Sequence, residues 1–230
     1  MRADPKHSEQ RKSLFREYTE SIVIAVVLAL VIRTFVVQAF KIPSGSMEDT
    51  LLIGDHILVN KLAYGLQIPI LDATWTLFGL FGEPKRGEII VFRFPRDPTR
   101  DFIKRVVGLP GDRVEVRNHR AYVNGEPLKE LYVQLDDDAV ARASPYRNWG
   151  PEVVPAGKLF MMGDNRDNSA DSRDWGFLER EKVRGRAFMI YWSWDSAPPK
   201  FFWLDRIPLP NPKAILVDGI RWRRIGKLLQ

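Results

Sequence analysis

The sequence predicts a mainly β protein, in which an antiparallel sheet domain follows one N-terminal membrane-spanning helix. Two observations support this prediction. An apolar run, interrupted by a single arginine, occupies residues 21–40. From residue 55 onward, short β-branched and aromatic runs alternate with Gly, Pro, Asn and Asp turns, which is the pattern of successive strands. We therefore expect a polar tail over 1–20, a membrane helix over 21–40 and a β domain over 41–230.

Composition narrows the possible partners. The 230 residues are 45% hydrophobic and 28% charged, with a net charge of +6, which is typical of a globular protein. The basic residues form no dense stripe with interleaved aromatics, so a nucleic-acid partner is not expected, and a membrane surface explains the excess equally well. There is no cysteine, and His7, His56 and His119 lie far apart. We therefore expect neither a metal site nor a cofactor.

The apolar run is long enough to cross a bilayer. About 20 helical residues span the hydrocarbon core, and the only charge within 21–40 is Arg33, near the far end, where its side chain can reach the interface. The tail should stay in the cytoplasm by the positive-inside rule, and everything after Phe40 should lie outside. The basic residues of the tail are Arg2, Lys6, Arg11, Lys12 and Arg16.

Two other interpretations of this run remain open at the level of sequence. A buried core helix is one, although residues 21–32 show no polar face. A cleavable signal peptide is the other, because a basic segment and a short apolar segment precede Val37-Gln38-Ala39, a small-x-small cleavage pattern.

The strands can be placed by their period-2 alternation and by the turns that end them. Asn118-His119 forms the turn of one predicted hairpin. Polar residues 126–156 are interpreted as an excursion or insertion, and 193–212 as a loop. Apolar residues 63–82 either form a loop packed on the domain or dip into the bilayer surface. The predicted strands are 56–60, 88–94, 101–107, 113–117, 120–124, 158–162 and 182–192.

Residues 40–47 carry the first candidate for chemistry. Ser44 and Ser46 stand two apart, held by Pro43 and Gly45. Such a segment can present a nucleophile on an irregular turn. A plain turn or linker is the more common meaning of Ser-Gly-Ser.

Lys104 is the informative residue of its predicted strand. Phe102 and Val106 share its face. Burial between apolar neighbours would lower the pKa of the lysine and make it a possible base. The alternative is an ordinary exposed strand lysine beside Arg105.

Residues 163–173 are dense in Asp, Asn, Ser and Arg. If buried, such a loop must satisfy its own hydrogen bonds and those of its neighbours. A solvated turn or a cation-binding loop are the alternatives. Arg166 and Arg173 argue against a calcium loop, which requires acidic ligands at alternate positions.

These three segments closely resemble the signature motifs of bacterial type I signal peptidase (leader peptidase). They are Ile42–Met47, Asp101–Asp112 and Met162–Arg173, in the family's order behind a membrane anchor. The resemblance runs from about residue 20 to the C-terminus and is poorest over 126–156. It implies the β fold shared by signal peptidases and SOS-response repressors. It also implies a serine endopeptidase of the bacterial inner membrane, which contacts lipid and removes signal peptides from exported preproteins after Ala-x-Ala sites.

The resemblance also implies a role for individual residues. Ser46 would be the nucleophile and Lys104 the general base, while the Ser44 hydroxyl and the Ser46 N–H would form an oxyanion hole. Ser169 would orient Lys104. Structural support would come from Gly163, Asp164, Asp171 and Arg173, and the substrate pocket would be lined by Phe40, Ile42, Met47, Leu51, Ile57, Val91, Phe102 and Ile103. The chain departs from the family at Asp49, often Pro, and at Asp174, often aromatic.

The implied chemistry is consistent with the residues present. A serine hydroxyl needs a base, no histidine lies in the three motifs, and a Ser–Lys pair can take the place of a triad. A self-cleaving Ser–Lys protease like the SOS-response repressors is disfavoured by the membrane span and by the lack of a helix-turn-helix. A membrane-anchored binding or chaperone module on the same fold, without catalysis, is the alternative from a different functional class.

Overall fold

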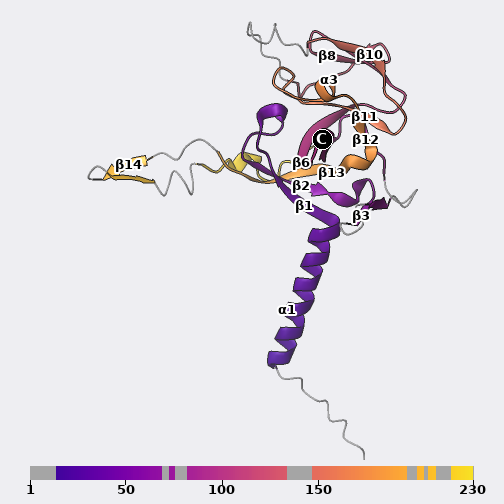
Figure 1. Cartoon of the computed structure of the whole chain (residues 1–230). Coiled ribbons are helices and arrows are strands. Elements are labelled where there is room, and N and C mark those ends of the chain that lie inside the picture. Colours follow the sequence, from indigo (N-terminus) through magenta and orange to yellow (C-terminus); the bar gives the residue numbers. More distant parts are fainter. Residues whose placement is uncertain are drawn as a thin grey trace, which may run out of the picture.

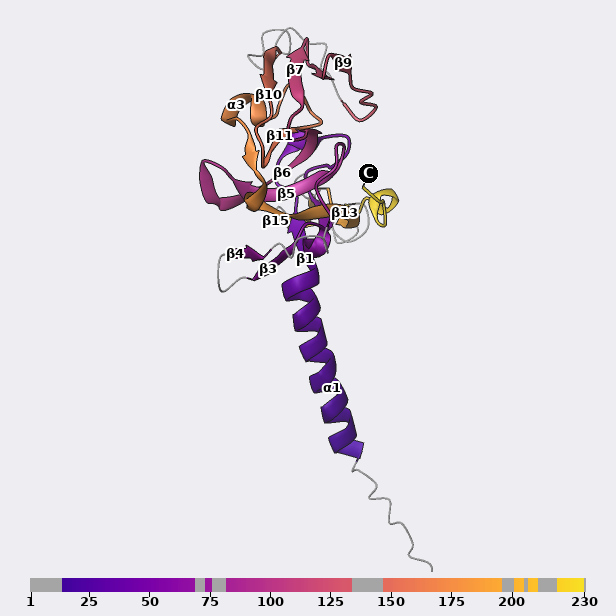
Figure 2. The same ribbon diagram turned by 90° about the vertical axis from the view of Figure 1, so that its right-hand side faces the viewer.

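The computed structural model confirms a mainly β protein with one long N-terminal helix. Figures 1 and 2 show this helix standing away from a β domain, which lies at its C-terminal end. The residues that the structure describes are 14–68, 73–75, 82–133, 147–195, 201–204, 207–210 and 219–229.

The helix ends earlier than the sequence predicts. Helix α1 spans Leu14–Val31 and continues as one π-helical turn over Ile32–Val36. The segment Phe15–Val36 is long and apolar enough to cross a membrane, and its side chains are not buried in the protein. The expected helix over 21–40 is therefore wrong at its C-terminal end. Residues Val37–Lys41 form strand β1 instead, because their backbone groups pair with strand β2, an arrangement that suits β-branched and aromatic residues.

The main sheet has seven strands in the order β1-β2-β13-β5-β6-β11-β12, and each strand is antiparallel to its neighbours. Strand β6 is longer than the segment predicted at 101–107, and β13 matches the segment predicted at 182–192 with a shift of one residue. The bounds are Asp55–Asn60 for β2, Ile89–Phe94 for β5, Asp97–Gly108 for β6, Lys158–Met162 for β11, Leu178–Glu179 for β12 and Val183–Ser193 for β13.

A second sheet has four strands in the order β10-β7-β8-β9. Asn118 and His119 have φ angles of 49° and 66°, as the predicted hairpin turn requires. The described ends of the 126–156 excursion return to this hairpin and extend the sheet on both edges, while 134–146 lie outside the described residues. The strands are β7 Arg113–Arg117, β8 Arg120–Val123, β9 Glu126–Pro127 and β10 Trp149–Val153.

Two further hairpins differ from the predicted irregular segments. Strands β3 (Leu66–Ile68) and β4 (Ala73–Trp75) pair near the C-terminal end of the helix in Figures 1 and 2. The side chains of 66–81, on which the membrane-surface interpretation depends, lie outside the described residues. Strands β14 (Phe201–Leu204) and β15 (Ile207–Pro210) pair within the predicted loop 193–212. The prolines of β15 hide this strand from a pattern search.

The apolar core consists of three clusters. The first packs beneath residues 42–51, the second lies against the middle strands, and the third joins the two sheets. Met47 and Leu51 have no exposed surface in the first cluster. Ile42, which is 2% exposed, belongs to the same cluster, so the chain that leaves β1 is anchored by buried side chains on both sides of Ser46. Apolar burial of this kind is the main source of stability in such a turn.

Candidate active site

Ser46 lies on a short 3₁₀ turn, Gly45–Met47, that follows β1 and Pro43. The turn is held by backbone hydrogen bonds from Glu48 N–H to the Gly45 carbonyl (3.0 Å) and from Leu51 N–H to the Met47 carbonyl (2.7 Å). Ser46 is only 8% exposed. A serine on a tightly held turn presents its hydroxyl in one direction, as a nucleophile must.

Lys104 lies on strand β6 and reaches the same point. Its Nζ is 2.7 Å from Ser46 Oγ and 2.9 Å from the Ile103 carbonyl oxygen. The residue is 3% exposed. Burial lowers the pKa of Lys104 from 10.5 to about 8, although the negative charges of Asp171 and Asp164 act in the opposite direction. About a tenth of the lysine is then neutral at pH 7, against well under a hundredth for a free lysine.

The surroundings of the Lys104 ammonium are mostly apolar. The Phe102 ring centroid lies 5.4 Å from Nζ, and Phe94 stacks on Phe102 with ring centroids 4.2 Å apart. Within the described residues, no carboxylate forms an ion pair with Lys104. The ring shields the lysine from water, and this desolvation favours the neutral amine and outweighs the attraction of the ring face for the ammonium.

Gly163 brings the polar loop 163–173 against the turn. A Cβ at this position would lie 2.2 Å from Ser169 Oγ and 2.4 Å from the Ser46 carbonyl oxygen, so only glycine fits. Ser169 is 3% exposed, and its hydroxyl has no hydrogen-bond partner in the described part of the chain. The hydrogen bond expected between Ser169 and Lys104 is therefore not formed here. Two of the three donor positions of Lys104 are occupied, so an orienting role for Ser169 stays a prediction.

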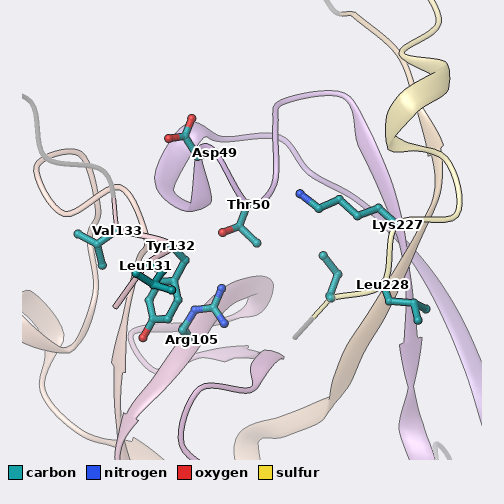
Figure 3. A pocket seen from close by; sticks show the side chains of 9 residues that line it. Asp49, Thr50, Arg105, Leu131, Tyr132, Val133, Lys227 and Leu228 are labelled. Carbon is teal, nitrogen blue, oxygen red and sulfur yellow. The ribbon is translucent and has the colours of Figure 1, made fainter. Parts of the chain in front are cut away.

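Asp164 fastens this loop to the other two motifs. Its carboxylate accepts hydrogen bonds from Arg105 Nε (2.9 Å) and Nη2 (2.7 Å), and from the Thr50 hydroxyl (2.6 Å). Both Arg105 and Asp164 are buried. Thr50 and Arg105 are supporting residues that the sequence analysis did not identify. Figure 3 shows the side chains of Thr50 and Arg105 directed toward the same space from opposite sides.

Asp171 and Arg173 form a second buried pair, with Asp171 oxygens 2.8 Å from Nε and from Nη2. Asp171 also accepts from the Gly163 N–H at 3.1 Å and caps the short helix α3, Ser172–Trp175. Arg173 donates to the Arg166 carbonyl at 2.8 Å. The pair therefore braces the loop from within and fixes the position of Gly163.

Asn165 is the most informative residue that the sequence analysis missed. Its backbone N–H donates to the Ser46 carbonyl (3.3 Å) and its Nδ2 donates to the Gly45 carbonyl (3.2 Å). It belongs to the polar run, but nothing in the sequence indicates which member of that run reaches the serine turn, 120 residues earlier.

A pocket of about 480 Å³ opens beside the pair. Ser44 lies at its edge, exposed and with no side-chain bond to the turn that it precedes. A group bound in this pocket would therefore contact both serines and the lysine. The lining residues are Pro43, Ser44, Gly45, Ser46, Arg100, Asp101, Phe102, Ile103, Lys104, Asn168 and Ala170.

The eight residues expected to line a substrate pocket divide into two groups. Phe102 and Ile103 line the open pocket. The other six belong to the first core cluster or pack against it, beneath the turn, and their contact with a substrate stays a prediction. They are Phe40, Ile42, Met47, Leu51, Ile57 and Val91.

Both departures from the family pattern have a local explanation. Asp49 has a φ of 72°, which proline cannot adopt. The Asp174 carboxylate forms an ion pair with Arg96 Nη1 at 3.4 Å, which an aromatic side chain could not form. Asp49 borders a second pocket of about 420 Å³, shown in Figure 3 and lined also by Arg105 and Lys227, and neither Ser46 nor Lys104 lines it.

The described residues contain no cluster of three or more His, Asp or Glu side chains able to hold a metal ion. The chemistry that the side chains themselves support is nucleophilic. A buried serine hydroxyl lies next to a lysine whose pKa is lowered, and both residues line a pocket of about 480 Å³. A hydroxyl beside a partly neutral amine meets the requirement for a serine nucleophile with a general base.

Comparison with known proteins gives a consistent result. The family model described as signal peptidase, peptidase S26, matches residues 15–192. The signal peptidase I of Pseudomonas aeruginosa is 40% identical, over 80% of this chain and 75% of its own. That of Aquifex aeolicus is 34% identical, over 93% of this chain and 98% of its own. A crystal structure of a signal peptidase I from Enterococcus faecalis matches 46% of this chain and 97% of its own, with 33% identity and a TM-score of 0.36.

Proposed function

The chain belongs to the signal peptidase I family of serine endopeptidases, peptidase S26, and we propose that it removes signal peptides from exported preproteins with a Ser46–Lys104 dyad. The observation that carries the dyad is the 2.7 Å contact between Lys104 Nζ and Ser46 Oγ in a buried site. The lowered pKa of Lys104, about 8, supports the role of a base.

In the proposed reaction, neutral Lys104 takes the hydroxyl proton of Ser46 as Oγ attacks the carbonyl carbon of the scissile peptide bond. The resulting oxyanion is stabilised by the Ser46 N–H and the Ser44 hydroxyl. Lys104 then gives its proton to the leaving amine, and the signal peptide remains as an ester on Ser46. A water molecule, deprotonated by Lys104, hydrolyses this ester and restores the serine.

We infer that the substrate lies in the pocket beside Ser46, with small side chains before the cut in an Ala-x-Ala pattern. Phe102 and Ile103 border this pocket, whose total volume of about 480 Å³ must also hold the backbone of the peptide. Bulky side chains next to the scissile bond should therefore be excluded.

We infer a single-pass location in the bacterial inner membrane, with the N-terminus in the cytoplasm and the β domain outside. The span Phe15–Val36 and the basic residues before it support this orientation. The active site would then stand on the side of the membrane where exported preproteins emerge.

The deciding experiment is cleavage of a peptide with Ala at the P1 and P3 positions by the full chain in detergent micelles. Wild type should cut after the P1 Ala, Ser46→Ala should not, and a peptide with Leu at P1 should resist. Binding of the peptide by wild type without cleavage would contradict the proposal and support the binding or chaperone module. Cutting by Ser46→Ala at the wild-type rate would exclude Ser46 as the nucleophile.

A further inference from the structure

We propose that Asn165 is a positioning residue that aims the Ser46 N–H into the substrate pocket as an oxyanion donor. The inference rests on the proposed function and adds a residue to it. Asn165 touches neither the hydroxyl of Ser46 nor the amine of Lys104 by any hydrogen bond of the described residues. It acts instead on the peptide group between Gly45 and Ser46.

The geometry of that peptide group links the Gly45 carbonyl to the Ser46 N–H. A trans peptide is planar, so its C=O and N–H point in opposite directions. The Gly45 carbonyl oxygen accepts hydrogen bonds from Asn165 Nδ2 (3.2 Å) and from Glu48 N–H (3.0 Å). Holding this oxygen toward the loop turns the Ser46 N–H the other way. Because Gly45 and Ser46 both line the open pocket, that direction leads to the substrate.

The Ser46 N–H is available for this role. Ser46 is the second residue of the Gly45–Met47 turn, and the first N–H groups of a helical turn have no partner within it. Such an N–H is a ready donor for a developing negative charge. Its direction is therefore important for the rate, and this direction is set through the Gly45 carbonyl, which Glu48 N–H and Asn165 Nδ2 hold together.

Asn165 is itself held in one orientation. It is 9% exposed, its Oδ1 accepts from the Asn168 N–H (3.3 Å), and its backbone N–H donates to the Ser46 carbonyl (3.3 Å). With Oδ1 engaged by a donor, the amide must present Nδ2 to Gly45. The two carbonyls that flank the Ser46 residue are thus both bound by Asn165.

The substitution Asn165→Asp isolates the Nδ2 donor. Aspartate keeps the size of the side chain and an oxygen acceptor for the Asn168 N–H, but it cannot donate to the Gly45 carbonyl. Asn165→Ala removes the donor without adding charge. The matched control is Asn148→Asp, just before β10, because Asn148 Oδ1 likewise accepts from a backbone N–H, that of Asn118 at 3.0 Å.

Steady-state cleavage of the P1/P3 Ala peptide measures the effect. For Asn165→Ala and Asn165→Asp we expect kcat to fall about 10- to 100-fold, with KM within twofold, because one donor to the oxyanion is misaimed. The acid limb of the pH–rate profile of Asn165→Ala should stay at the wild-type position, because the substitution does not touch Lys104. When an Asn165 substitution is combined with Ser44→Ala, the loss in kcat should be less than the product of the two single losses, because both residues act on one oxyanion.

An unchanged kcat in both Asn165 variants would overturn the proposal. So would a displaced acid limb in Asn165→Ala, because the residue would then act through Lys104. If Asn165→Ala does not fold, Asn165→Asp carries the same kcat test. Failure of the proposed function gives a different result, since wild type and Asn148→Asp would then not cleave the peptide at all.

Discussion

Lys104 shows what a buried base costs the folded protein. Its pKa is about 8 in the folded chain and near 10.5 when exposed. Below pH 8 the folded protein must hold a buried positive charge, so the unfolded chain binds the proton more tightly and stability is reduced by roughly 3 kcal/mol. As the pH rises from 8 to 10.5 this penalty is progressively lost.

We therefore predict that Lys104→Met is inactive but more stable than wild type at pH 6–7. The gain in the free energy of unfolding should approach roughly 3 kcal/mol below pH 8 and shrink toward zero as the pH nears 10.5. Denaturant unfolding of both proteins in the same micelles at several pH values measures this gain. A gain that grows with pH would show that the charge of Lys104 is stabilised, rather than penalised, by folding.

Gly163 gives a second prediction about a single residue. A methyl group there would lie 2.2 Å from Ser169 Oγ and 2.4 Å from the Ser46 carbonyl, so the loop and the serine turn must separate. We expect Gly163→Ala to lose at least 100-fold in kcat, because small displacements of reacting groups are costly. Gly157→Ala is the contrasting case, since its φ of 72° strains an alanine but no atom lies within 4 Å of its Cβ, and it should keep its kcat. Full activity in Gly163→Ala would contradict the close contact.

At the scale of elements, loop 163–173 depends on its buried ion pairs. Asp171→Asn leaves Arg173, whose side chain is fully buried, without its carboxylate, and loss of one partner typically costs about 3–5 kcal/mol. The negative charge of Asp171 also raises the pKa of Lys104, so its removal should move the acid limb of activity to lower pH. Thermal unfolding and a pH–rate profile measure the two effects.

The control for that variant is the double substitution Asp171→Asn with Arg173→Met, which removes the unpaired charge and should regain much of the stability. A single variant as stable as wild type would show that the pair is not important for the loop. An acid limb that stays in place would show that Asp171 does not act on Lys104.

The elements also show how far the sequence alone reaches. Strands β2, β5, β7, β8, β11 and β13, and the C-terminal part of β6, were predictable because alternating side chains and turn residues are local signals. The end of α1 was not, since no Gly or Pro separates the helix from β1 and only pairing with β2 decides where the strand begins. The loop 163–173 was recognisable as special, but the contacts of Asn165 and Arg105 join residues tens of positions apart, and no local pattern encodes them.

At the scale of the whole molecule, the structure bears on whether the protein cuts itself from its anchor. Val37-Gln38-Ala39 fits the Ala-x-Ala pattern of the proposed substrates. Yet Ala39 pairs with Leu58 within the β1–β2 ladder of the main sheet. A peptide must leave such a ladder before it can enter the site. Phe40, which packs on the first core cluster, would have to leave with it.

We therefore predict that the chain purified from membranes keeps its N-terminus. Intact-mass analysis or N-terminal sequencing should show no major species that begins at Phe40. The same preparation of Ser46→Ala is the control, because it cannot cut itself. A dominant wild-type species starting at Phe40, absent from Ser46→Ala, would show self-cleavage and revive the interpretation as a removable signal peptide.

The pH dependence of kcat/KM for the P1/P3 Ala peptide tests the dyad most directly, because its acid limb reports the base of the free enzyme. The Ser46–Lys104 dyad predicts activity that rises tenfold per pH unit at low pH and levels off above about pH 8, the pKa of buried Lys104. Lys104→Arg should show no such activity at any pH, since a guanidinium does not give up its proton. A limb near pH 6.5 that moves on substitution of His56, or substantial turnover by Lys104→Arg, would contradict it.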